Sequence, residues 1–308
     1  MNSALTVIDR RLIEASAEIL GGEAKDISFL HSILSQCSLP YREPEGEKGV
    51  YIKQNGKASI IIQAGYLVNP KTGVPELQGV PYGAKPRLLL IHLCTEAIRL
   101  QKPNIEVQDS MSAFMKKLGL SVTGGKKGSI GRFKEQLNRL AACRMQIAMA
   151  SDRGVSIVNP SPVVKRFDLW FPSDPRQKIL WPSEIVLSDE FFSSLKNHAM
   201  PLDYRAIKAI QHNARALDLY VWLAHRLPRV KGEKGDRISW QALHSQFGSD
   251  ISELNNFRRK TLEALKQTLA IYPKARVKQV EGGLLLSKSA PPIKGKVSKR
   301  RQKISLKK

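Results

Sequence analysis

The feature that most constrains the fold is an order of helical and strand-like segments that occurs twice in the chain. In the first half, two helical segments lead into a glycine- and lysine-rich turn at residues 119–128, and a third helical segment follows at 129–145. Strand-like sequence then surrounds a turn at Asp152, Arg153 and Gly154. Two helices, a basic turn, a third helix and a β-hairpin form the element order of a winged helix-turn-helix.

The second half repeats this order without sequence identity to the first. A long helical segment at 203–227 is followed by a short one at 238–248 and a longer one at 252–273. A hairpin at 275–289 then turns around Gly282. The sequence therefore predicts an α+β fold that contains two tandem winged-helix domains.

Additional elements precede the first domain, and a basic tail follows the second. The predicted units are an N-terminal winged-helix domain, a C-terminal winged-helix domain and a tail, at residues 1–197, 198–290 and 291–308. We expect two short amphipathic helices at 3–20 and 27–37, and a β-hairpin that turns at Asn55 and Gly56. The tail has eight Lys or Arg and no acidic residue, which predicts a disordered arm.

The charge balance indicates a polyanionic partner. Fifty Lys and Arg against 27 Asp and Glu give a formal net charge of +23, which favours nucleic acid or an anionic membrane. No stretch approaches the roughly 20 apolar residues of a membrane span, and the N-terminus lacks a signal-peptide pattern, so we expect a cytoplasmic protein without membrane contact. Cys37, Cys94 and Cys143 lie far apart among apolar residues, which predicts buried single thiols and no metal site.

The glycine- and lysine-rich turn is typical of a phosphate-binding loop, but its spacing differs from that of a nucleotide P-loop. Five residues separate Gly119 from Gly125, where the P-loop has four, and Lys127 takes the place of the Ser or Thr that binds Mg²⁺. No cofactor is expected. We predict instead that Lys126 and Lys127 contact DNA phosphate, together with Ser129 at the start of the next helix.

The third helix of each domain is the predicted base-contacting element. On a helical wheel of the first domain, Arg132, Gln136 and Arg139 lie opposite the apolar stripe, and these side-chain types bind guanine and adenine edges. The corresponding residues of the second domain are Asn255, Asn256, Arg259 and Lys260, although Glu263 lies on the same face. An ordinary solvated helix face is the alternative in both domains. At the hairpins we expect phosphate contacts from Arg153, Arg276 and Lys278.

Three blocks of sequence resemble the RepA family of plasmid replication initiators. They are GVPYGAKPRLLLIHLCTEAI at 79–98, the segment 109–143 that contains the basic turn, and parts of 238–286. The resemblance extends from about Ser28 to Leu286. It implies binding to direct repeats in a plasmid origin, opening of the duplex, recruitment of the host replication initiator and helicase, and control of the protein's own promoter and of plasmid copy number.

Two other classes of protein were weighed against an initiator. A rolling-circle nicking enzyme needs a closely spaced histidine pair for a metal and a nucleophilic tyrosine, and the six histidines contain no such pair, so we expect no catalysis. A winged-helix transcriptional repressor without initiator activity remains open as the alternative. A homodimer is possible under either interpretation.

Overall fold

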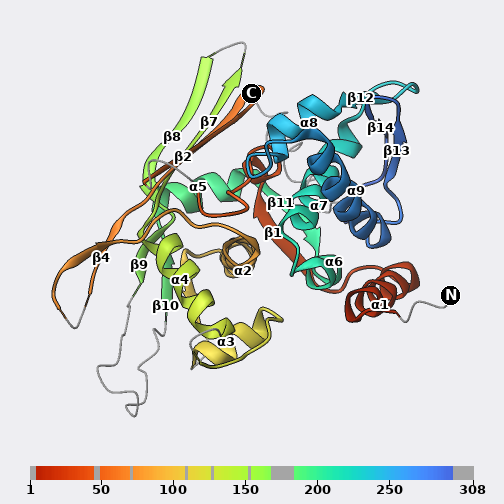
Figure 1. Ribbon diagram of the computed structural model, residues 1–308. Coiled ribbons are helices and arrows are strands. Elements are labelled where there is room, and N and C mark those ends of the chain that lie inside the picture. Colours follow the sequence, from red (N-terminus) through yellow and green to blue (C-terminus); the bar gives the residue numbers. More distant parts are fainter. Residues whose placement is uncertain are drawn as a thin grey trace, which may run out of the picture.

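The chain folds into helices and small sheets arranged as two units side by side (Figure 1). The computed structural model describes residues 5–44, 49–69, 72–107, 110–125, 128–151, 154–167 and 184–293; for residues 151, 154–160, 166 and 167 it describes the backbone only. Every strand pairing in these ranges is antiparallel. The expected α+β class therefore agrees with a structure of mixed α and β elements.

The first unit is built around three helices and a three-stranded sheet. Its elements are α2 (Ala84–Leu100), β6 (Asn104–Glu106), α3 (Met111–Lys117), α4 (Ser129–Ala142), β9 (Val164–Phe167) and β10 (Glu184–Leu187). The strands lie in the order β6-β10-β9, so the strand between the first two helices pairs with the second strand of the hairpin. Ser110 caps α3 by accepting a hydrogen bond from the Ala113 amide at 3.1 Å.

The second unit has the same topology. Its elements are α7 (Ala214–Arg226), β12 (Asp236–Ser239), α8 (Trp240–Phe247), α9 (Leu254–Ala270), β13 (Arg276–Val280) and β14 (Gly283–Ser287). The strand order β12-β14-β13 matches the order β6-β10-β9 of the first unit position by position. Ser239 caps α8 as Ser110 caps α3, with the Ala242 amide as donor at 3.1 Å. The repeated element order predicted from the sequence is present.

The hairpin that belongs to the first unit is not the one that the sequence predicts. The sequence analysis assigned the strands around residues 152–154, but β7 (Arg144–Ser151) and β8 (Gly154–Pro162) lie in a separate four-stranded sheet of order β2-β3-β7-β8. The hairpin that completes the first unit is β9–β10. The pairing of β7 with β3 accounts for the difference. Strand β3 lies far away in the sequence, so local sequence patterns do not reveal it as the partner of β7.

The N-terminal hairpin is confirmed, and it forms half of this four-stranded sheet. Strands β2 (Val50–Asn55) and β3 (Ala58–Gln63) meet at a two-residue turn in which Gly56 has a φ of 56°. A small hairpin follows, made of β4 (Tyr66–Val68) and β5 (Pro75–Leu77). In Figure 1 it projects from the edge of the molecule.

Two predicted helices have a different structure. Residues 27–37 form β1 (Ile27–His31) and a 3-10 helix η1 (Ser32–Ser35), because β1 pairs with β11 (Ala199–Asp203). The long helix expected at 203–227 is divided into α6 (Tyr204–Ile210) and α7. Asn213 causes the break, because its side chain accepts hydrogen bonds from the amides of Arg215 and Ala216 and begins a new helix.

Three further elements are a helix that precedes both units, a helix between them and a short turn inside the second unit. They are α1 (Val7–Gly21), α5 (Asp189–His198) and the 3-10 turn η2 (Leu227–Arg229). The first predicted helix, 3–20, corresponds to α1, which Thr6 caps in a reciprocal pair of hydrogen bonds with Asp9. The predicted boundary at residue 198 falls where α5 ends and β11 begins, and the tail from 294 onward lies outside the described residues.

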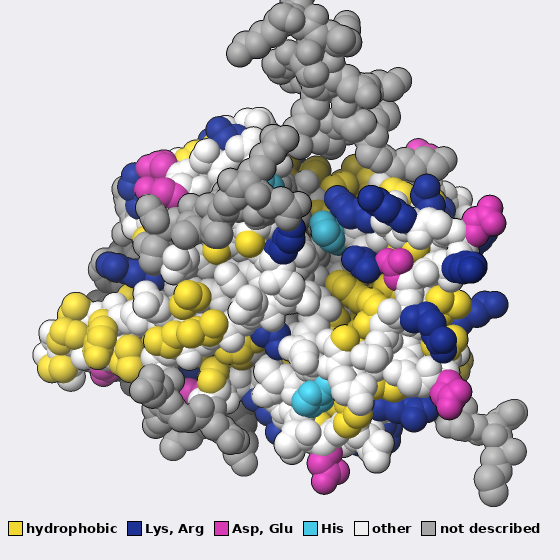
Figure 2. Space-filling model, turned by 90° about the horizontal axis from the view of Figure 1, so that it is seen from above, with side chains coloured by type: hydrophobic (Ala, Val, Ile, Leu, Met, Phe, Trp, Pro, Cys, Tyr) yellow, Lys and Arg dark blue, Asp and Glu magenta, His cyan; other side chains and the backbone are white. Residues whose placement is uncertain are grey.

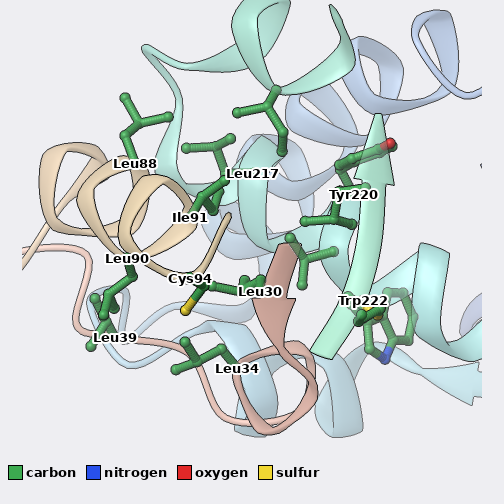
Figure 3. Close-up of a cluster of buried hydrophobic side chains, with 14 of the residues drawn as sticks. Leu30, Leu34, Leu39, Leu88, Leu90, Ile91, Cys94, Leu217, Tyr220 and Trp222 are labelled. Carbon is green, nitrogen blue, oxygen red and sulfur yellow. The ribbon is translucent and has the colours of Figure 1, made fainter. Parts of the chain in front are cut away.

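The hydrophobic core is continuous across both units. Figure 3 shows side chains from β1, η1, α2 and α7 in one cluster, among them Leu30, Ile91, Cys94, Leu217 and Tyr220. The three cysteines are buried free thiols, as the sequence predicts. Burial raises the pKa of Cys37 to about 11 and the pKa values of Cys94 and Cys143 to about 12.

Two buried histidines predict how stability depends on pH. Burial, with a smaller effect of His198, lowers the pKa of His31 to about 3, and burial near Lys117 and Arg99 lowers the pKa of His92 to about 4. In the unfolded chain both imidazoles take up a proton near pH 6.5, so below that pH the unfolded state binds more protons than the folded state.

Acidification should therefore favour unfolding. We expect each of the two histidines to lower the free energy of unfolding by about 1–2 kcal/mol between pH 7 and pH 5. Urea titrations at both pH values measure the change, and a His92→Gln variant should have a shallower pH dependence than the wild type. An identical slope in this variant would contradict the assignment.

Candidate nucleic-acid interface

The basic turn closes against the N-terminus of α4. Ser129 Oγ donates a hydrogen bond to the Ser121 carbonyl at 2.7 Å and accepts one from the Thr123 amide at 2.9 Å. A side chain at position 128 would lie 2.3 Å from the Thr123 carbonyl oxygen, so only glycine permits this close approach. Ser129 therefore holds the shape of the turn, and Lys126 and Lys127 lie outside the described residues.

Two predicted base-contacting residues of α4 face the protein interior. Gln136 and Arg139 are only 5% and 9% exposed. The Gln136 side-chain oxygen accepts a hydrogen bond from the Tyr82 amide at 2.8 Å. Arg139 forms ion pairs with Glu43 at 2.9 Å and Glu135 at 2.8 Å. The prediction that these two side chains contact bases is therefore wrong, because residues near Tyr82 cover this face of α4.

The exposed residues of α4 lie in its N-terminal half, from Gly131 to Glu135. Arg132 is exposed there, and Lys85 at the start of α2 lies near it. Burial and the positive charge of Arg132 lower the pKa of the Lys85 ammonium, with Glu135 acting in the opposite direction. Two cations held this close repel each other, and an anion such as a phosphate would relieve that repulsion.

The face of α9 is open along its first two turns. Phe257 is fully buried and fixes the helix, while Asn255, Arg258 and Arg259 are exposed. Arg259 donates to Asn256 Oδ1 at 3.2 Å and to Glu263 Oε1 at 2.9 Å. With 63% of the Arg259 side chain exposed, Glu263 orients the guanidinium on the helix surface without covering it. The predicted repulsion by Glu263 is thus partly neutralised by Arg259.

Further cations are exposed on the three-stranded sheet of the second unit. Arg276 and Lys278 on β13 and Arg237 on β12 are exposed, and Lys260 of α9 is half-buried. Figure 2 shows Lys and Arg side chains gathered on the side of the molecule that contains α8, α9 and β12–β14. Of the predicted residues of the second unit, Asn255, Arg259, Arg276 and Lys278 are exposed and Asn256 and Lys260 are half-buried, whereas Arg153 lies outside the described residues.

Three cations of these surfaces were missed in the sequence analysis. Arg258 is exposed and lies 5.6 Å from the centre of the Trp240 ring. A helical wheel of α9 could have identified it as exposed, because it lies next to the buried Phe257 in the sequence. Arg237 could have been found once the strand before α8 was recognised. The position of Lys85 beside Arg132 joins two helices, so no local pattern in the sequence identifies it.

Two other kinds of site are absent from the described residues. In these ranges no group of three or more His, Cys, Asp or Glu is arranged to hold a metal ion. Nor do the described helices include one of sufficient length and apolarity to cross a bilayer.

Solved structures with a similar fold include two crystal structures of domains 2 and 3 of RctB. One, of a selenomethionine derivative, has a TM-score of 0.49 and 12% sequence identity and covers 82% of this chain and 95% of its own. The second has a TM-score of 0.46 and 14% identity, with 82% and 94% coverage.

The sequence comparisons address the family directly. No curated protein matched the chain. The family model described as plasmid encoded RepA protein matches residues 80–242, which run from just before α2 into α8 and make up more than half of the chain. The chain therefore belongs to the family of plasmid-encoded RepA proteins.

Proposed function

We propose that this RepA-family protein is a plasmid replication initiator that binds repeated double-stranded sites in the plasmid origin. The observation that carries the proposal is the open polar face of α9, where Asn255, Arg258 and Arg259 are exposed and Arg258 lies 5.6 Å from the centre of the Trp240 ring, directly after β12. Asn and Arg are the side chains that most often bind adenine and guanine edges in the major groove. Family membership supports a plasmid origin as the source of that DNA.

In this proposal both units act as winged helices, but their tasks differ. The second unit contacts bases through α9 and phosphates through β13. The first unit contacts phosphates with Arg132 and Lys85 at the start of α4 and α2, because Gln136 and Arg139 are engaged inside the protein and the Ser129 hydroxyl donates to the Ser121 carbonyl. Base contacts distinguish sequences, whereas phosphate contacts set position and orientation.

Further steps follow from the family resemblance. The bound protein would help to open the duplex, recruit the host replication initiator and helicase, and occupy its own promoter. We propose no catalytic step and no cofactor for this chain. The high positive charge supports the initial electrostatic association with DNA.

The proposed phosphate contacts of the basic turn predict how DNA affinity depends on salt concentration. Replacing Lys126 and Lys127 with alanine should weaken binding to origin and random DNA alike, because phosphates are present in every sequence. The slope of log K against log salt should decrease by about two units, roughly 0.9 for each lost contact. Fluorescence anisotropy at several salt concentrations measures this slope.

A matched control is Lys102→Ala together with Lys234→Ala, which removes two exposed cations that are not among the proposed contacts. This control should leave the salt slope nearly unchanged. If the Lys126 and Lys127 variant also keeps the wild-type slope, the basic turn does not hold phosphate. If the wild-type protein binds origin and random DNA equally, the proposed function itself is wrong.

A further inference from the structure

We propose that a buried joint between the two units fixes the spacing of the DNA that the protein accepts. This inference rests on the proposed function, because it assumes that both units contact the same repeat. Its positioning residues are Tyr41, Arg87, Arg215 and Asp218, with Lys53 at the periphery.

The first part of the joint is a two-stranded sheet made from both parts of the chain. Strand β1 pairs with β11 along five residues, from Ile27 opposite Asp203 to His31 opposite Ala199. On its other side β1 is bound to α2 of the first unit, where the Phe29 amide donates to Thr95 Oγ1 at 2.8 Å. The strand that leads into the second unit is therefore attached to the first helix of the first unit.

The second part is a buried ion pair between the central helices. Arg87 of α2 binds Asp218 of α7 through Nε and Nη2, both at 2.8 Å, and the two side chains are 6% and 9% exposed. The remaining guanidinium donors bind the carbonyls of Leu39, Pro40 and Gly83. All five N–H donors are thus occupied, and this planar pairing restricts rotation of α7 against α2.

A second arginine extends the joint toward the DNA-contacting helices. The Arg215 guanidinium lies 4.3 Å from the Tyr41 ring centre, and Arg87 lies 4.9 Å from the same ring. Arg215 also binds Asp250 at 2.7 Å in the turn that connects α8 to α9, and its guanidinium lies 5.4 Å from the Phe257 ring of α9. The N-terminal part of α9 is therefore positioned through Arg215.

The third part is a contact between α8 and the sheet of the N-terminal hairpin. Lys53 on β2 donates a hydrogen bond to the Ser245 carbonyl of α8. Gln246 of α8 donates to the Gln36 carbonyl at 3.2 Å, and Asn55 donates to the same carbonyl at 3.1 Å. The sheet joins β1 to β11, the ion pair joins α2 to α7 and this contact joins β2 to α8, so the two units are held together through three different pairs of elements.

A rigid joint has a direct consequence for the DNA site. B-DNA turns once in about 10–10.5 base pairs, so inserting five base pairs moves half of a site to the opposite face of the duplex. Two units joined by a flexible linker would follow such a change, because a linker only sets an effective concentration. Two units joined as described would lose one of the two contacts.

The test uses the full-length protein and one origin repeat whose protected halves have been located by hydroxyl-radical footprinting. Inserting five base pairs between the halves should weaken wild-type binding at least tenfold, while inserting ten should restore part of the affinity. The variant Asp218→Asn should lose affinity for the intact repeat and show less than a threefold penalty for the five-base-pair insertion. Lys53→Met with Gln246→Leu serves as a second variant if Asp218→Asn does not fold.

Failure of the proposed joint and failure of the proposed function give different results in this test. Equal wild-type binding to repeat and random DNA would contradict the proposed function. Clear preference for the repeat with equal tolerance of all insertions would overturn the joint and leave the function standing. Sensitivity that persists unchanged in a folded joint variant would also overturn it.

Energy transfer between two dyes gives a second measurement without DNA. The native thiols are buried, so cysteines introduced by Lys102→Cys and Lys234→Cys at exposed positions can be labelled selectively. A single narrow distance distribution supports the joint, and a broad or double distribution overturns it.

Discussion

Replacing Asp218 with alanine is expected to lower the free energy of unfolding by about 3–5 kcal/mol. The change leaves the Arg87 guanidinium buried without its counter-charge, and breaking one side of a buried ion pair has a cost of this size. Arg87 is only 6% exposed, so bulk solvent does not compensate for the lost carboxylate. Urea or thermal unfolding followed by circular dichroism measures the difference.

A surface ion pair provides the control. Lys165 and Asp189 lie 2.9 Å apart, but their side chains are 60% and 71% exposed. Lys165→Ala should change the free energy of unfolding by less than about 1 kcal/mol, because solvent screens such a pair. A similar small effect of Asp218→Ala would show that the Arg87 ion pair does not contribute as described.

The double variant Asn255→Ala and Arg259→Ala is expected to weaken binding to the origin repeat by about 2–6 kcal/mol, from two base contacts of about 1–3 kcal/mol each. Binding to random DNA should change much less, because base contacts carry the sequence discrimination. Competition titrations with origin and scrambled duplexes measure both affinities.

Lys266→Ala is the matched control, because Lys266 is an exposed cation on the same helix, two turns after Arg259. It should leave the ratio of origin to random affinity unchanged. The assignment of α9 as the base-contacting helix would fail if the double variant weakened both DNAs equally.

The sequence predicts the repeated architecture because helical and strand periodicities are local signals. The helices α8 and α9, the hairpin β13–β14 and the turn at Gly56 all depend on nearby residues, and the structure contains each of them. The α9 surface was also accessible to sequence analysis, because only one side of that helix is packed.

The failures concern features that depend on distant residues. A helical wheel assumes one packed face, but α4 is covered on a second side by residues near Tyr82, which occupy Gln136 and Arg139. The strand β1 looks helical in isolation and becomes a strand because β11 pairs with it. In the same way β7 and β8 belong to the sheet of β3, although the sequence places them directly after α4.

Footprinting of the purified protein on its own plasmid distinguishes an initiator from a repressor. We expect protection of several regularly spaced direct repeats in the origin, with loss of this pattern in the Asn255 and Arg259 double variant. Protection of a single inverted repeat at a promoter, and of no repeats in the origin, would contradict the initiator and favour a transcriptional repressor.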